Sequence, residues 1–188
     1  RRFGGDVKQM KRYISMFLII ILCFLLQTTL FQNLKIANVS PNLLIILISS
    51  YGFMYGRKFG MISGILCGIM SDFIYNDIIG IYILIYVLAG YINGSAHKLY
   101  FKDDMSIPVF AIALSDLFVN TLFYTFSFLL RGRLDILVYM KNIILPELVY
   151  TVIIGVIIYK MLNKLEDKMY PPVEVPLDSG NNTGQEEI

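Results

Sequence analysis

The chain has 188 residues, of which 56% are hydrophobic and only 16% charged, and its mean hydropathy is +0.65. These values are too apolar for an ordinary soluble domain, and a formal net charge of +2 is too small to indicate a nucleic-acid-binding protein. The composition therefore predicts an integral membrane protein that does not bind nucleic acid.

Six apolar stretches follow one another along the chain. A helix needs about 20 mostly apolar residues to cross a bilayer, and lipid cannot satisfy the backbone amides of an irregular segment, so each stretch is predicted to be a helix. The second and fourth are short, which leaves a re-entrant or closely associated pair as an alternative there. The predicted spans are residues 13–31, 41–55, 59–75, 79–93, 107–130 and 143–162.

The chain is thus predicted to be an all-α, polytopic membrane protein with three parts. Residues 1–12 form an N-terminal segment, residues 13–165 form the six-helix transmembrane domain, and residues 166–188 form a disordered tail rich in Pro, Gly, Asn and acids. The sequence MKRYI from Met10 is a natural start, so residues 1–9 are interpreted as upstream or added sequence.

Lysine and arginine predict the orientation of the bundle. Twelve of the 16 fall on the side of both termini and the remaining four on the other side, so both termini are predicted to be cytoplasmic. Topological anchoring is the favoured role for the basic turn Arg57–Lys58 and for the loop at residues 97–104. Contacts to anionic lipid or to a cytoplasmic partner are the alternative.

The third span carries Gly60, Gly64 and Gly68, and Asp72 continues the four-residue series. Residues four apart lie on one helical face, and a stripe of small residues lets another helix approach closely in lipid, where burial of apolar area gives no driving force. The stripe predicts close packing of this helix. Asp72 has two interpretations: a cap for the turn before residue 79, or a contact point inside the bundle or with a partner.

Two further acids, Asp116 and Glu147, lie inside predicted spans, and Pro146 is expected to kink the last helix beside Glu147. A structural or water-facing role is favoured over a proton relay, because a relay needs several groups in register and the only histidine, His97, lies in a predicted loop. The motifs of metalloproteases, serine hydrolases and nucleotide-binding proteins are missing. No catalytic, cofactor-binding or metal-ligating residue is therefore predicted, and the chain is predicted not to be an enzyme.

From about residue 11 to residue 165, the order of these features resembles the rod shape-determining protein family MreD of bacteria. Asn42 replaces the commoner Asp of that family, and Glu147 stands where a small polar residue is usual. The positions that carry the resemblance are Pro41 and Asn42 at the start of the second span, Arg57 in a basic turn, Gly64, Gly68 and Asp72, Gly80 before the fourth span, and Pro146.

The resemblance implies a bundle similar to the substrate-binding subunits of energy-coupling-factor transporters, in the cell membrane of a bacterium. It implies a non-enzymatic adaptor of the elongasome, the complex that builds lateral cell wall. Its partners would be MreC and, indirectly, RodA, a class B penicillin-binding protein and MreB, together with membrane lipids. The alternative function is a vitamin-binding transporter subunit, which commonly presents an A-xxx-A face on its first helix; FLIIILCFLLQTTLF contains no alanine.

Overall fold

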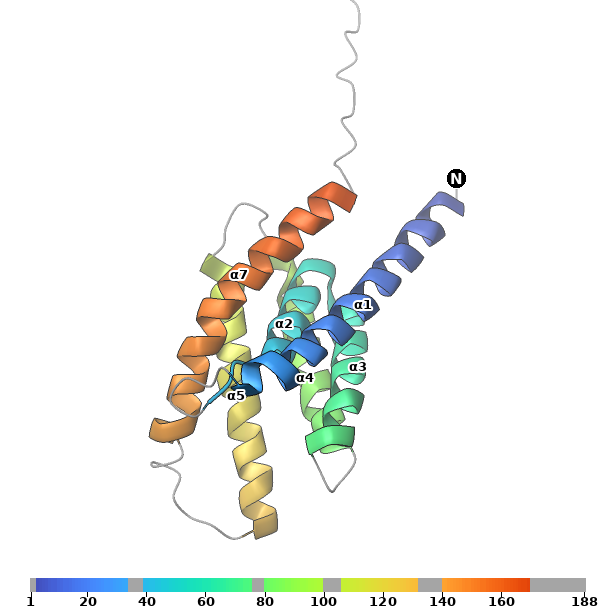
Figure 1. Ribbon diagram of the computed structural model, residues 1–188. Coiled ribbons are helices and arrows are strands. Elements are labelled where there is room, and N and C mark those ends of the chain that lie inside the picture. The colour runs from blue at the N-terminus through green and yellow to red at the C-terminus, as the bar shows by residue number, and fades with distance from the viewer. Residues whose placement is uncertain (1–2, 34–38, 76–79, 100–105, 132–139, 170–188) are drawn as a thin grey trace, which may run out of the picture.

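The computed structural model describes residues 3–33, 39–75, 80–99, 106–131 and 140–169. Within these residues the protein is all-α, and the predicted fold class is confirmed to that extent (Figure 1). The helices are α1 Phe3–Asn33, α2 Leu43–Tyr55, α3 Arg57–Tyr75, α4 Ile81–Ser95, α5 Ser106–Arg131 and α7 Leu145–Met169, with a 3-10 turn at Ala96–Leu99 and a π-helical turn at Met140–Ile144.

The outermost helices extend beyond the predicted apolar spans. Helix α1 begins at Phe3, within the segment predicted to precede the bundle, and α7 ends at Met169, so residues 166–169 are helical and not tail. Arg12 on α1 donates to Glu166 on α7 at 3.2 Å. This ion pair stabilises helical turns that lie past the apolar stretches. The rest of the predicted tail lies outside the described residues.

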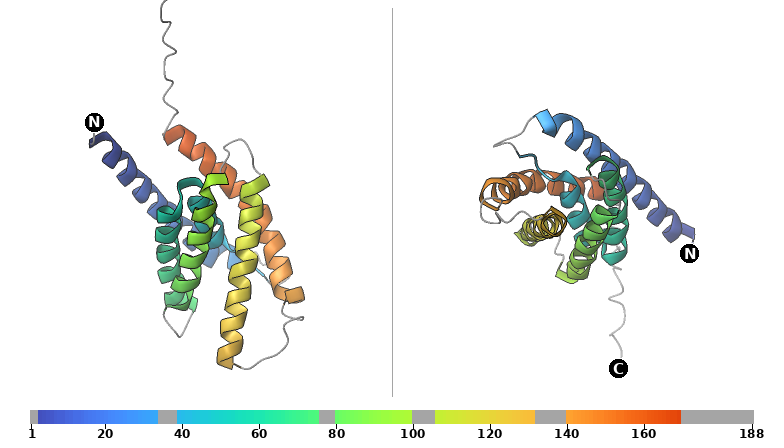
Figure 2. Two further views of the ribbon diagram at one scale, coloured as in Figure 1. Left: turned by 180° about the vertical axis from the view of Figure 1, so that it is seen from behind. Right: turned by 90° about the horizontal axis from the view of Figure 1, so that it is seen from below.

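Helix α2 forms the centre of the bundle. Every residue from Leu43 to Met54 is buried, and the side chains of residues 44–48 have no exposed surface. A helix that is apolar on all sides is a buried helix, and α2 packs against α1, α3, α4, α5 and α7 (Figure 2). Its 13 residues span about 20 Å, which is too short to cross the hydrocarbon core of a bilayer. Burial among the other helices explains how so short an apolar helix is accommodated.

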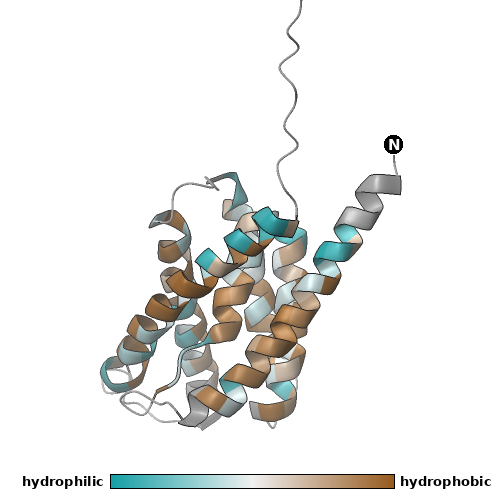
Figure 3. Cartoon of the chain, turned by 45° about the horizontal axis from the view of Figure 1, so that its top comes forward, coloured by the Kyte–Doolittle hydropathy of each residue, from teal (hydrophilic) through white to brown (hydrophobic). Residues whose placement is uncertain are grey.

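Three of the described helical segments are long and apolar enough to cross a membrane unaided, namely Gln9–Leu30, Ser106–Phe126 and Met140–Met169. Their outer faces carry large apolar side chains along four-residue repeats. Figure 3 shows in brown the hydrophobic residues that make up most of α1 and α7 between their polar ends. On α7 the repeat is Val149, Ile153, Ile157 and Met161, each more than half exposed. Such surfaces suit hydrocarbon, in agreement with an integral membrane protein.

Candidate functional site

The glycine stripe of α3 lies against α4 of the same chain. A Cβ atom added at Gly64 would lie 2.5 Å from the carbonyl oxygen of Tyr86, and one at Gly60 would overlap the carbonyl oxygen of Gly90. At Gly68 the added atom would lie 2.5 Å from a backbone Cα of α4. Backbone atoms cannot move aside as a flexible side chain can. The two helices therefore require glycine at these positions to approach as closely as they do.

The α4 side of this contact is also built from glycine, which was not predicted. A Cβ at Gly90 would overlap the carbonyl of Gly60, and one at Gly94 would overlap the backbone of Arg57. The signal was present in the sequence, because Gly90 and Gly94 are four residues apart in the fourth span. Small residues on both helices make the contact reciprocal, in the manner of paired small-xxx-small motifs.

Asp72 caps the first turn of α4. Its carboxylate accepts hydrogen bonds from the backbone N–H groups of Gly80 at 2.9 Å, Tyr82 at 3.0 Å and Ile83 at 3.3 Å. Gly80 itself has a left-handed φ of +111° and offers no side-chain cap, so the acid on α3 does that work. The structure thus places Asp72 as a cap and as a contact inside the bundle, where three N–H donors and the positive end of α4 compensate its charge.

The N-terminus of α2 is buried, and three polar side chains satisfy its backbone N–H groups. Asn42 accepts from Ile45 N at 3.2 Å, Gln27 accepts from Leu44 N at 3.3 Å, and Thr151 accepts from Asn42 N at 3.1 Å. Pro41, just before this cap, is buried. Gln27 and Thr151 were not predicted, although a glutamine inside an apolar span is itself a signal that a polar group nearby needs a partner.

Asp116 on α5 and Glu147 on α7 interact electrostatically, and the Asn120 side chain lies beside the Glu147 carboxylate. Asp116 has no exposed surface, and within the described residues neither of its carboxylate oxygens has a hydrogen-bond partner. Pro146 is the second residue of α7, and α7 directly follows the π-helical turn Met140–Ile144. Within the helical segment Met140–Met169 the π-helical turn thus lies just before the proline, whose missing N–H leaves a carbonyl of that turn without a helical donor.

A hydrogen bond between α4 and α5 was also missed from sequence. Asn93 donates to the Ser115 hydroxyl at 2.6 Å and to the Ala89 carbonyl at 2.8 Å, and both side chains are buried. Ser115 in turn donates to the carbonyl of Ala111 at 2.7 Å. These contacts fix the spacing of α4 and α5. The signal was an asparagine at membrane depth, which needs a partner.

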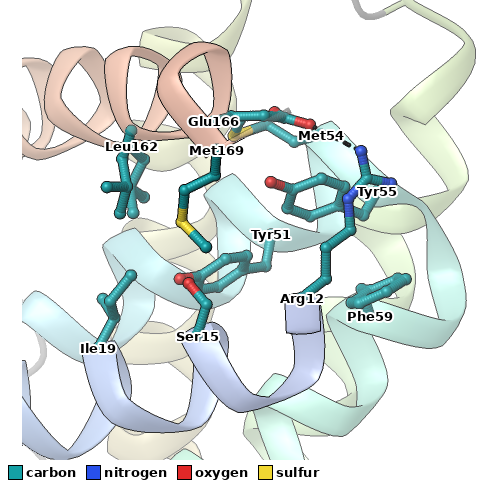
Figure 4. Close-up of a pocket in the computed structure, with 11 residues that line it drawn as sticks. Arg12, Ser15, Ile19, Tyr51, Met54, Tyr55, Phe59, Leu162, Glu166 and Met169 are labelled. Atoms are coloured by element: carbon teal, nitrogen blue, oxygen red, sulfur yellow. Dashed lines mark hydrogen bonds and ion pairs between the residues drawn. The ribbon is translucent and has the colours of Figure 1, made fainter. Parts of the chain in front are cut away.

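Helices α1, α2 and α7 meet at the end of the bundle shown in Figure 4. Arg12 reaches Glu166 there, and its guanidinium lies 5.0 Å from the centroid of the Tyr55 ring. A cavity of only about 20 Å³ remains between these side chains. Across the described part of the chain, no cluster of three or more His, Cys, Asp or Glu side chains could hold a metal ion.

Comparison with known proteins gives one family. The family model of the rod shape-determining protein MreD matches residues 8–169, which includes almost all of the described helical region. No curated protein and no solved structure matches the chain. The expected similarity to substrate-binding subunits of energy-coupling-factor transporters therefore stays a prediction.

Proposed function

We propose that this chain, which belongs to the MreD family of rod shape-determining proteins, is a non-enzymatic membrane adaptor of the elongasome. In this role it binds MreC and, through MreC, supports the wall-synthesis enzymes RodA and a class B penicillin-binding protein and the MreB filament. The observation that carries the proposal is the family match over residues 8–169. We further propose six spans with both termini in the cytoplasm.

The internal packing of the bundle supports a scaffold. The close contact between α3 and α4, and the cap that Asp72 provides, join these two helices into a unit whose interfaces are already filled by the chain itself. The surface beside the end of this unit remains apolar: Phe73 is 76% exposed, the most of any large hydrophobic side chain in the described residues. With Ile65 and Ile69 it forms an outer stripe on α3 at four-residue spacing.

We place the contact with the single-span partner on this outer stripe. A partner helix that packed there would lie beside the turn that Asp72 and Gly80 shape. Aromatic side chains that are exposed at one end of a helix are frequent anchors of protein interfaces. The glycine face of α3 is unavailable to a partner, because α4 covers it.

The test is affinity purification of the tagged full chain from its native membrane in mild detergent, with mass spectrometry of co-purifying proteins and small molecules. We expect MreC to be recovered with the parent chain and with Ile153→Ala, a matched change on the exposed stripe of α7, and to be reduced several-fold with Phe73→Ala. Equal recovery with both variants would refute the α3 surface. Recovery of an ATPase module with a stoichiometric vitamin, without MreC, would refute the adaptor and favour the transporter subunit.

A further inference from the structure

A second, larger cavity lies at the same end of the bundle as the Arg12–Glu166 ion pair. Its volume is about 580 Å³, and it is bounded by α1, by the short connection from α2 to α3, and by the end of α4 with the 3-10 turn that follows. A volume of this size lies within the range of about 300–1,000 Å³ that is usual for small-ligand sites. Four basic side chains line it: Arg57, Lys58, His97 and Lys98.

The charge of this cavity has one sign. None of the described residues that line it is Asp or Glu. The neighbouring small cavity, in contrast, pairs Arg12 with Glu166 at 3.2 Å. Simple topological anchoring requires basic residues on one side of the membrane but does not require them to converge on a common cavity. The convergence therefore needs an additional explanation.

The backbone brings these basic side chains together. Gly56, with a φ of +90°, separates α2 from α3 and allows α3 to start immediately with Arg57 and Lys58. The first turn of α3 contains no acid, so the positive end of the helix adds to the positive field of the cavity. The Arg57 guanidinium is held 5.2 Å from the centroid of the Tyr91 ring on α4. The His97 ring is held by α2, because its Nδ1 atom lies 2.7 Å from the carbonyl oxygen of Phe53.

We propose that this cavity binds the phosphate head group of an anionic membrane lipid. Arginine, lysine and a helix N-terminus are the groups that recognise phosphate oxygens in proteins. A lipid is favoured over a soluble phosphate because α1, which lines the cavity through Gln9 and Tyr13, also has a lipid-facing surface. Its large apolar side chains Met10 and Ile14, next to these residues, are each more than half exposed. This apolar outer surface of α1 provides a path for hydrocarbon chains next to the residues of α1 that line the cavity.

The experiment measures lipid binding to the purified, delipidated full chain in neutral detergent by native mass spectrometry. Phosphatidylglycerol is titrated against phosphatidylcholine, whose head group has no net charge, and inorganic phosphate is added in a separate arm. The test variant is Lys58→Gln/Lys98→Gln, which removes two exposed charges from the cavity and keeps the Arg57–Tyr91 contact. The control is Lys164→Gln/Lys168→Gln, which removes two exposed charges from the end of α7, outside the cavity.

We expect preferential binding of phosphatidylglycerol by the parent chain. A lysine near an anionic surface contributes about fivefold in affinity, so the Lys58/Lys98 variant should bind about 30-fold more weakly if the two effects add. The control should change by less than threefold. An equal loss in both variants would overturn the proposal, because it would indicate general attraction to a basic surface.

Displacement of phosphatidylglycerol by submillimolar inorganic phosphate would overturn the lipid assignment in favour of a soluble phosphate compound. Arg57→Lys provides a further variant with unchanged charge. Arg57→Lys should keep most of the affinity if the positive charge of the cavity attracts the phosphate. Loss of binding in this folded variant would refute a site that binds the head group through its positive charge. Elution of each variant as the same monodisperse species on gel filtration checks that the bundle is intact.

Discussion

Replacement of Asp72 by Asn tests the cap between α3 and α4 most directly. One carboxylate oxygen accepts from Gly80 and Ile83, and the other accepts from Tyr82. Asparagine is nearly the same size but has one oxygen only. If that oxygen keeps its two donors, the side-chain NH2 group faces the Tyr82 N–H, and two donors oppose each other in a site where Asp72 is 1% exposed.

The magnitude follows from these contacts. The loss of one hydrogen bond to a charged group costs about 1.5–3 kcal/mol, and loss of the negative charge at a helix N-terminus costs about 0.3–1 kcal/mol more. A total of about 3 kcal/mol corresponds to a fall in melting temperature of about 6–12 °C for a chain of this size. Thermal unfolding of the purified protein in detergent, followed by the loss of the monodisperse species on gel filtration, measures it.

Asp116→Asn is the matched control for this prediction. Asp116 is equally buried, but its carboxylate oxygens have no hydrogen-bond partner in the described residues, so the amide should be tolerated or should raise the melting temperature. The reasoning is refuted if Asp72→Asn melts within 2 °C of the parent chain. It is also refuted if both variants fall by the same amount, because burial of a carboxyl group would then matter and the cap would not.

Three further outcomes are expected. Gly64→Ala should destabilise the bundle by about 1–3 kcal/mol, because its methyl group would meet a backbone carbonyl. Gly155→Ala, whose methyl group would lie 3.3 Å from a side-chain carbon of Ile112, should have a clearly smaller effect, and equal melting temperatures would contradict the α3–α4 contact. Ser115→Ala should lower the free energy of unfolding by about 1–3 kcal/mol in the same assay, because the buried Asn93 side chain loses the hydrogen bond that it donates to the Ser115 hydroxyl. A shift in melting temperature below the error of the assay would contradict this. Lys141→Cys should react with a membrane-impermeant maleimide in intact cells and Lys168→Cys only after permeabilisation; the reverse pattern would overturn the predicted orientation.

The positions of the helices could be predicted because they depend on local composition. Each predicted span corresponds to one helix, and the family resemblance drawn from Pro41 to Pro146 is confirmed by the family match. The ends were less accurate for a physical reason. Apolar stretches report the part of a helix that lies in hydrocarbon, whereas the polar turns of α1 and α7 are held by contacts between distant residues, such as Arg12 with Glu166.

The partners of the polar residues could not be predicted, because they are set by the order in which helices pack. The stripe at Gly60, Gly64 and Gly68 predicted that another helix packs closely against α3, but it did not identify that helix as α4. The central position of α2 could not be predicted either, because a continuous run of apolar residues is compatible with a helix surrounded by lipid or by protein. Only the packed structure shows that Gln27 satisfies a donor of this buried helix.

The use of these features inside the bundle limits where partner recognition can occur. A buried acid and a glycine stripe in a membrane helix are candidate sites for a partner, yet here α4 of the same chain provides both the three donors for Asp72 and the backbone surface for Gly64. The outer faces of the long helices are apolar, and burial of apolar area alone gives no hydrophobic driving force within lipid, where helices associate through close packing and polar contacts. For the proposed adaptor, we therefore expect the specific part of recognition at the two ends of the α3–α4 unit, where shape and polarity add to the apolar contact along the outer stripe of α3. One end carries Phe73 beside a glycine turn, and the other carries the basic cavity around Arg57.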